Sequence, residues 1–355
     1  MARFVMAGGG TGGHVLPLIA VARELRSRGH EVTFVGTQAG YEARLVPEAG
    51  FPIEWIQSVS LAGAGVSGML RALTVLPRSV VRCWRMLGRI RPHAVFSLGG
   101  FAAGPVAAAA ILRRIPLVVM EPNAYPGAAN RWCARWVRRA LLGWPEAARY
   151  FPAGRAEVTG VPVREEFFAL PAAGGPLTVL ITGGSQGSRT LNNAFRESWP
   201  LFRESGLDIR FVHQCGQAME SGLAAGFAAS GLDGQVSAFI GDMPAAFAEA
   251  SVIVARAGAG SVAEIAAAGR PSILVPYPHA ADDHQTRNAE VLARAGAARI
   301  VPDGEMNGPR LLAEVRALAD PQVRARMAWA AKSLARPGAA ARAAGILEQI
   351  AQKGG

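Results

Sequence analysis

The sequence contains few cysteines and almost no lysine. Its 355 residues include 3 cysteines, which lie far apart and form no Cys-x-x-Cys pair. We therefore expect a reducing compartment, with neither a disulfide framework nor a zinc cluster. Hydrophobic residues make up 50% of the chain and the 42 glycines follow no G-X-Y period, which excludes disordered and collagen-like proteins.

The charge is strongly unbalanced and is carried by arginine. The formal net charge is +11, and Lys332 and Lys353 are the only lysines. A basic surface predicts an anionic partner: a nucleotide, a nucleic acid or a membrane lipid. No recognised DNA- or RNA-binding motif is present, so nucleic acid is not expected. Arginine alternates with Leu and Trp over residues 69–91 and 131–139, which suits an anionic membrane surface, although a buried helix with a solvated arginine face is an equal alternative.

A membrane-spanning helix is not expected. Residues 92–112 carry no formal charge and are long enough to cross a bilayer, but glycine and proline interrupt them. They are better interpreted as a strand, a glycine turn and a helix. Residues 3–7 run directly into Gly8, so we also expect no secretory leader at this end.

Short apolar runs alternate with helical patterns throughout the chain, which predicts parallel sheets in an α/β protein. Strands are expected at residues 3–7, 31–35, 94–98, 117–120 and 140–142, and then at 177–182, 209–213, 237–240, 252–255 and 273–275. The two series predict two Rossmann-like domains, residues 1–160 and 161–337, that face a cleft. A last helix, about residues 338–352, is expected to return to the first domain.

The first glycine turn, Gly8-x-Gly10-x-x-Gly13, predicts close approach of an anion to a helix N-terminus. The acidic residue that would hold a ribose after the second strand is missing, because Val35 is followed by Gly36-Thr37-Gln38. A nicotinamide dehydrogenase is therefore not favoured. His14 follows the turn and is a candidate general base, with a simple hydrogen-bonding role at the helix start as the alternative.

Three further segments contain candidate ligand-binding residues. Residues 256–264 predict a helix that begins near Ser261, with N–H groups for a diphosphate and Glu264 for ribose hydroxyls; Ser261 and Glu264 could equally form a capping box. Residues 279–288 favour a sugar-binding loop over a metal site made by His279, Asp282 and His284. Asn123, just past a strand, is either a ligand residue or part of a turn.

Together these motifs resemble a known family. Gly8-Gly9-Gly10-Thr11-Gly12-Gly13-His14, the Gly183-Gly184-Ser185-Gln186-Gly187 loop, residues 256–264 and Asp283-His284-Gln285 are similar, in this order, to the bacterial undecaprenyl-diphospho-muramoylpentapeptide β-N-acetylglucosaminyltransferases of glycosyltransferase family 28. The resemblance implies the two-domain GT-B fold. It also implies transfer of GlcNAc from UDP-GlcNAc to the C4 hydroxyl of MurNAc in lipid I, which forms lipid II.

The resemblance also implies site residues. Glu264 would be the ribose-binding acid and Ile240 a backbone contact to uracil. The other positions implied for UDP-GlcNAc are Thr11, Gly12, Gly13, Asn123, Arg164, Ser185 and Gln285. From the residues themselves, His14 is expected to be the base, and the N–H groups of Ala259, Gly260 and Ser261 are expected to bind the diphosphate. His284 and Pro122 stand where family members vary.

No Asp-x-Asp motif stands in a convincing metal context, so neither a metal nor a cofactor is expected, and helix dipoles would neutralise the diphosphate. The family implies a peripheral location on the cytoplasmic face of the bacterial inner membrane. UDP-GlcNAc, lipid I, the anionic membrane surface and other cell-wall synthesis proteins are the expected partners. Another GT-B sugar transferase, a UDP-GlcNAc 2-epimerase and a membrane-bound nucleotide-sugar sensor are the alternatives.

Overall fold

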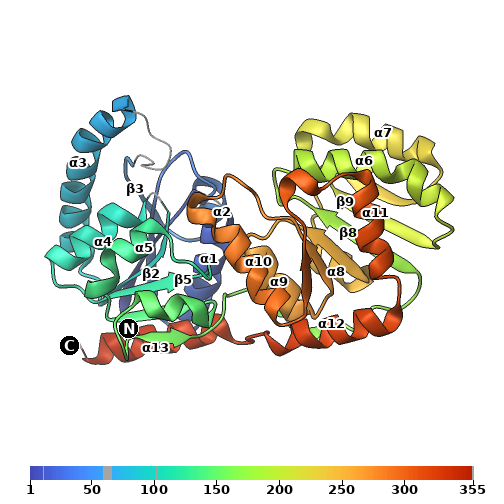
Figure 1. The fold of residues 1–355 in the computed structure, drawn as a ribbon. Helices are drawn as coiled ribbons and strands as arrows, with labels where there is room; N and C mark the ends of the chain where they lie inside the picture. The colour runs from blue at the N-terminus through green and yellow to red at the C-terminus, as the bar shows by residue number, and fades with distance from the viewer. Residues whose placement is uncertain (11, 59–65, 101, 354–355) are drawn as a thin grey trace. The chain divides into compact units, whose positions relative to one another are not determined.

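The computed structural model describes residues 1–10, 12–58, 66–100 and 102–353 (Figure 1). The chain divides into two compact units, one formed by Met1–Val163 with Gly338–Gly355 and the other by Arg164–Pro337. Each unit is built around its own parallel sheet.

The first unit contains a seven-stranded sheet in the order β3-β2-β1-β4-β5-β6-β7. Its strands are almost continuous apolar runs because helices cover both faces of the sheet. The strands are β1 Arg3–Gly8, β2 Glu31–Gly36, β3 Ile53–Trp55, β4 Ala94–Gly99, β5 Leu117–Glu121, β6 Arg139–Leu142 and β7 Ala156–Val158.

Alternate side chains of β1 enter two separate cores of this unit. Phe4 and Met6 pack with residues of α1 and α13, whereas Val5 and Ala7 pack with residues of α3 and α4. The helix α13, red in Figure 1, therefore belongs to the first unit although it ends the chain. The helices of this unit are α1 Gly12–Ser27, α2 Glu42–Glu48, α3 Val66–Ile90, α4 Ala103–Leu112, α5 Ala128–Cys133 and α13 Ala339–Lys353, with 3-10 turns η1 Ala134–Trp136 and η2 Pro145–Tyr150.

The second unit contains a six-stranded sheet in the order β10-β9-β8-β11-β12-β13. Its strands are β8 Leu177–Thr182, β9 Ile209–Gln214, β10 Asp233–Ser237, β11 Val252–Ala255, β12 Ser272–Leu274 and β13 Ala298–Ile300. Its helices are α6 Arg189–Glu204, α7 Glu220–Ser230, α8 Met243–Glu249, α9 Ala259–Ala268, α10 His284–Arg294, α11 Gly308–Ala317 and α12 Pro321–Ser333, with 3-10 turns η3 Glu165–Ala169, η4 Gln217–Met219, η5 Ala281–Asp283 and η6 Asp303–Glu305.

One predicted strand is wrong in its position. The apolar pattern predicts a strand at residues 237–240, but β10 ends at Ser237 and the apolar residues after it lie in a loop. The physical reason is that β10 is the edge strand of its sheet, where polar residues such as Asp233 and Gln235 are accommodated. Over the described ranges, no helix is both long and apolar enough to cross a membrane.

Candidate functional site

Two glycine turns of the first unit pack directly against each other. Gly8 and Gly99 end the neighbouring strands β1 and β4 and are paired in the sheet. A Cβ atom on Gly100 would lie 2.4 Å from the carbonyl oxygen of Gly9, and the φ angle of Gly100 is +82°. Only glycine fits this position, since both the space and the left-handed backbone exclude a side chain.

The first helix begins directly after the first of these turns. Helix α1 starts at Gly12, so Gly12, Gly13 and His14 occupy its first turn, where backbone N–H groups have no partner within the helix. His14 is half-buried and Gly13 is exposed. Thr11, which the sequence analysis also selected, lies outside the described residues.

Glu42, which was not among the predicted site residues, holds this turn. Glu42 is fully buried, and its Oε2 accepts a hydrogen bond of 2.8 Å from the N–H of Gly10. Its Oε1 accepts bonds from the N–H and the hydroxyl of Thr37, at 3.0 and 2.8 Å. A Cβ on Gly9 or Gly40 would lie within 2.3 Å of this carboxylate, so these glycines make room for it. The feature that could have indicated Glu42 is that three glycines, Gly9, Gly36 and Gly40, surround this single acidic residue.

Asn123 is held by a second buried carboxylate at the end of β5. Both its backbone N–H and its side-chain Nδ2 donate to Glu121 Oε1, each at 3.0 Å. The other oxygen of Glu121 accepts bonds from the Gly127 N–H and from Asn130 Nδ2, both at 2.9 Å. Burial raises the pKa of Glu121, and these hydrogen bonds oppose the shift.

In the second unit, a glycine turn connects β8 to α6. The backbone of this turn packs on the end of β9, since a Cβ on Gly187 would lie 2.0 Å from the carbonyl oxygen of Cys215. Ser188 caps α6 by accepting a bond of 3.3 Å from the N–H of Leu191. Ser185 is exposed at the outside of the turn, where it is accessible to a ligand.

The helix after β11 begins earlier than expected. Helix α9 starts at Ala259 with Gly258 as its N-cap, so Ser261 lies within the first turn. The alternative that Ser261 and Glu264 form a capping box is therefore wrong. A Cβ on Gly258 or Gly260 would meet no heavy atom of the described chain within 4 Å. Packing within the described chain therefore does not require glycine at these two positions. Because they carry no side chain, the N-terminus of α9 is not covered by them.

Glu264 projects from the second turn of α9 and is half-buried. Burial raises its pKa to about 7, and the positive charge of Arg164 opposes this shift. Arg164 precedes η3 and lies over the ring of Phe167, with its guanidinium carbon 5.1 Å from the ring centroid. The structure thus places these two predicted site residues close enough to interact.

The side chain of Gln285 binds the backbone just before the start of α9. Its Oε1 accepts hydrogen bonds from the N–H groups of Ala257, at 3.1 Å, and Tyr277, at 3.0 Å. Asn288 donates to the carbonyl oxygen of Ala257 at 3.2 Å. Because the Oε1 atom accepts both of these bonds, the NH2 group is the part of the Gln285 amide that can donate to a ligand.

Ile240 is the last of the predicted positions in the second unit. It lies in the loop after β10, and its N–H donates to Gln214 Oε1 at 2.9 Å. In the described part of the chain, no group of three or more His, Cys, Asp or Glu residues is placed to hold a metal ion.

Comparison with known proteins identifies the family. The glycosyltransferase family 28 N-terminal domain matches residues 4–142, and the C-terminal domain of the same family matches residues 178–344. A UDP-N-acetylglucosamine–N-acetylmuramyl-(pentapeptide) pyrophosphoryl-undecaprenol N-acetylglucosamine transferase of Solibacter usitatus is 57% identical over 353 residues, which cover 99% of this chain and 97% of that protein. A protein of the same name from Anaeromyxobacter sp. (strain K) is 42% identical over 99% of this chain and 94% of its own length.

Solved structures agree with this result. The crystal structure of Acinetobacter baumannii MurG has a TM-score of 0.82 and 34% sequence identity, covering 98% of this chain and 100% of that one. The glycosyltransferase of kitacinnamycin has a TM-score of 0.73 at 19% identity, over 98% of this chain and 99% of that one, and thus shares the fold alone. The predicted fold class, two parallel-sheet α/β domains of the GT-B type, is confirmed. The chain belongs to glycosyltransferase family 28, among the relatives of MurG.

Proposed function

We propose that this protein transfers GlcNAc from UDP-GlcNAc to the C4 hydroxyl of MurNAc in lipid I, forming lipid II. The observation that carries the proposal is the 57% identity, over nearly the whole chain, to a transferase whose name states these donor and acceptor groups. The glycine turns after β1 and β8 and the open helix end at Gly258 supply backbone N–H groups that suit an anionic donor.

The reaction is a single displacement. The oxygen of the acceptor C4 hydroxyl forms a bond to C1 of GlcNAc, and the bond between C1 and the diphosphate breaks with its electron pair on UDP. His14 takes the hydroxyl proton, and the configuration at C1 inverts. His14 belongs to the first unit and Glu264 to the second.

Residues of several helices and loops bind the different parts of the UDP-GlcNAc donor. The N–H groups of Ala259, Gly260 and Ser261, together with Ser185 and Arg164, stabilise the charge that develops on the departing diphosphate. Glu264 accepts hydrogen bonds from the ribose hydroxyls, and the backbone of Ile240 contacts the uracil. Thr11, Gly12, Gly13, Asn123 and Gln285 complete the UDP-GlcNAc positions.

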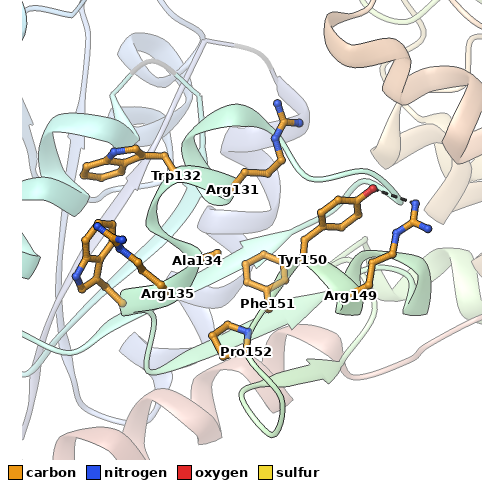
Figure 2. Close-up of a pocket in the computed structure, with 9 residues that line it drawn as sticks. Arg131, Trp132, Ala134, Arg135, Arg149, Tyr150, Phe151 and Pro152 are labelled. Atoms are coloured by element: carbon orange, nitrogen blue, oxygen red, sulfur yellow. Dashed lines mark hydrogen bonds between the residues drawn. The ribbon is translucent and has the colours of Figure 1, made fainter.

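The proposed membrane-binding surface lies on the first unit. Trp84 of α3 is 45% exposed, and Arg82, Arg85 and Arg89 are exposed on the same helix. A second cluster lines a hollow of about 520 Å³, shown in Figure 2, with Arg131, Trp132, Ala134, Arg135, Trp136, Arg149, Tyr150, Phe151 and Pro152. Tryptophan rings beside arginine suit the interface of an anionic bilayer.

Arginine and tryptophan interact closely within these clusters. The guanidinium carbon of Arg113 lies 3.9 Å from the ring centroid of Trp84, and that of Arg135 lies 3.8 Å from Trp136. The rings of Trp132 and Trp136 are 5.5 Å apart. These contacts hold the side chains in an exposed, mixed aromatic and basic arrangement.

Vesicle flotation tests the membrane surface. Replacing Arg82, Arg85 and Arg89 by Ala should weaken binding to anionic vesicles about 100-fold, since each arginine contributes about 1 kcal/mol near such a surface. The matched control replaces three exposed arginines of the second unit, Arg203, Arg316 and Arg326, with the same change of charge. Equal binding of the wild type to anionic and neutral vesicles would reject the electrostatic part.

The function itself is tested by measuring UDP release with and without a lipid I analogue. The proposal expects release only when the acceptor is present. Release or conversion of UDP-GlcNAc without acceptor would favour the 2-epimerase, and binding without turnover would favour a nucleotide-sugar sensor.

A further inference from the structure

Lys332, one of the two lysines in the chain, binds the short segment that follows Arg164. Its Nζ donates to the carbonyl oxygen of Phe168 in η3, at 2.8 Å, and to that of Ala267 in the last turn of α9, at 2.7 Å. Its aliphatic stem lies over Gly269, because a Cβ added to this glycine would be 3.2 Å from the lysine Cδ. One ammonium group therefore connects η3 to the C-terminal end of α9, where the helix dipole favours a positive charge.

A second cation, Arg270, binds the chain just after η3. Its side chain is 3% exposed, and the guanidinium donates to the carbonyl oxygen of Pro171 at 2.7 Å. It also donates to the carbonyl oxygens of Phe247, at 2.8 Å, and Ala248, at 3.2 Å, both in α8. Burial and the charge of Arg270 lower the pKa of Lys332, so the two cations lie near each other. A buried charge is costly unless it is hydrogen-bonded, and here its bonds join the chain after η3 to the end of α8.

The packing of η3 against α8 and α9 determines where Arg164 lies. Phe167 in η3 is fully buried, and its ring meets that of Phe247 edge-on, with the centroids 5.0 Å apart. Arg164 directly precedes η3, and its guanidinium carbon is 5.1 Å from the centroid of the Phe167 ring. The place of this arginine therefore depends on the place of η3.

We propose that Lys332 and Arg270 are positioning residues that hold η3 on α8 and α9 and thereby keep Arg164 beside Glu264. The proposal rests on the proposed function, because it assumes that Arg164 and Glu264 bind the donor. The positive charge of Arg164 favours the ionised form of Glu264, which accepts hydrogen bonds from ribose hydroxyls. If η3 is held less firmly, donor binding should weaken most in the pH range where Glu264 is partly protonated.

The first test measures how the affinity for UDP-GlcNAc depends on pH in Lys332→Met. Methionine keeps an apolar stem over Gly269 but cannot donate to the two carbonyl groups. We expect the midpoint of the pH dependence to rise by about half a unit, which increases the dissociation constant at pH 7 about twofold. The KM for UDP-GlcNAc should rise by a similar factor, with kcat nearly unchanged. Arg326→Met is the matched control, since it removes an exposed positive charge from the same helix and should leave the midpoint unchanged.

A double-mutant cycle separates positioning from the direct effect of the lost lysine charge. Arg164→Gln alone should raise the midpoint. Adding Lys332→Met to it should cause no further rise, because the side chain that Lys332 positions is then neutral. An unchanged midpoint in a folded Lys332→Met protein would overturn the proposal, and so would an equal rise with and without Arg164.

Hydrogen exchange tests the same contact without a ligand. Peptides that cover residues 164–171 should exchange faster in Lys332→Met than in the wild type, whereas Arg326→Met should match the wild type. Equal exchange in all three proteins would overturn the proposal. Failure of the wild type to bind UDP-GlcNAc would instead refute the proposed function, and the exchange rates would still decide whether Lys332 holds η3.

Discussion

The protonation of Glu264 should control the affinity for the nucleotide sugar. Burial raises the pKa of this carboxyl group from an ordinary value of 4.5 to about 7, with Arg164 opposing the shift. Ribose hydroxyls donate hydrogen bonds, so they bind the ionised carboxylate better than the protonated acid. The affinity for UDP-GlcNAc should therefore decrease as the pH falls through 7, and binding near pH 7 should release about half a proton per molecule bound.

The size of the effect follows from the fraction of Glu264 that is ionised. With a pKa of about 7, about nine tenths of the groups are ionised at pH 8 and about one tenth at pH 6. If only the ionised form binds, the dissociation constant rises about tenfold over this range, or about 1.4 kcal/mol.

The assay is calorimetry with UDP-GlcNAc at pH 6, 7 and 8 in buffers of different ionisation enthalpy, which also counts the released proton. UDP-GlcNAc is preferable to UDP, because a terminal phosphate itself titrates near pH 6. Glu264→Gln is the control: it should bind more weakly at pH 8 and show a flat pH profile. A wild-type affinity that stays constant from pH 8 to 6, or the same pH dependence in Glu264→Gln, would refute the reasoning.

Three other predictions concern single residues. His14→Ala should reduce kcat by about 10²–10⁴ with little change in the KM for UDP-GlcNAc, and near-normal turnover would reject its role as the base. Glu42→Gln places an amide donor against the N–H donors that this buried carboxylate accepts, so denaturant unfolding should show a loss of about 1–3 kcal/mol, whereas the exposed Glu48→Gln should lose almost nothing. Burial lowers the pKa of His213 to about 3, so the folded protein holds it neutral while the unfolded chain takes up a proton below about pH 6.5. Stability should therefore fall by about 2 kcal/mol between pH 8 and 5, and His213→Gln should lose less; an equal acid loss in both proteins would contradict this account.

The sequence predicted most of the fold because buried parallel strands are short, continuous apolar runs. The sequence-based prediction was wrong at two places, where a local pattern did not match the burial or the capping of the residues. The apolar residues 238–240 suggested a strand, yet Phe239 is 64% exposed and lies after the strand end. The start of α9 was placed near Ser261, a good capping residue, whereas Gly258 takes the N-cap position without any side-chain hydrogen bond.

The residues that the sequence missed act over long separations. Glu42 holds Gly10, which precedes it by 32 positions, and Gln214 contacts Gly184 and Ile240, at separations of 30 and 26 positions. Local patterns do not identify the partners in such pairs; for Glu42 they offer only the nearby glycines. They follow from the order of strands in each sheet, which brings the loops at the strand ends together.

The central claim is that this protein joins GlcNAc to a lipid-linked MurNAc acceptor. The most direct measurement incubates the wild type with UDP-GlcNAc and a lipid I analogue, and then examines the product by mass spectrometry and NMR. The account predicts one GlcNAc added per UDP released, in a β linkage to C4 of MurNAc. An unchanged acceptor, an α linkage or an epimerised UDP-sugar would contradict it.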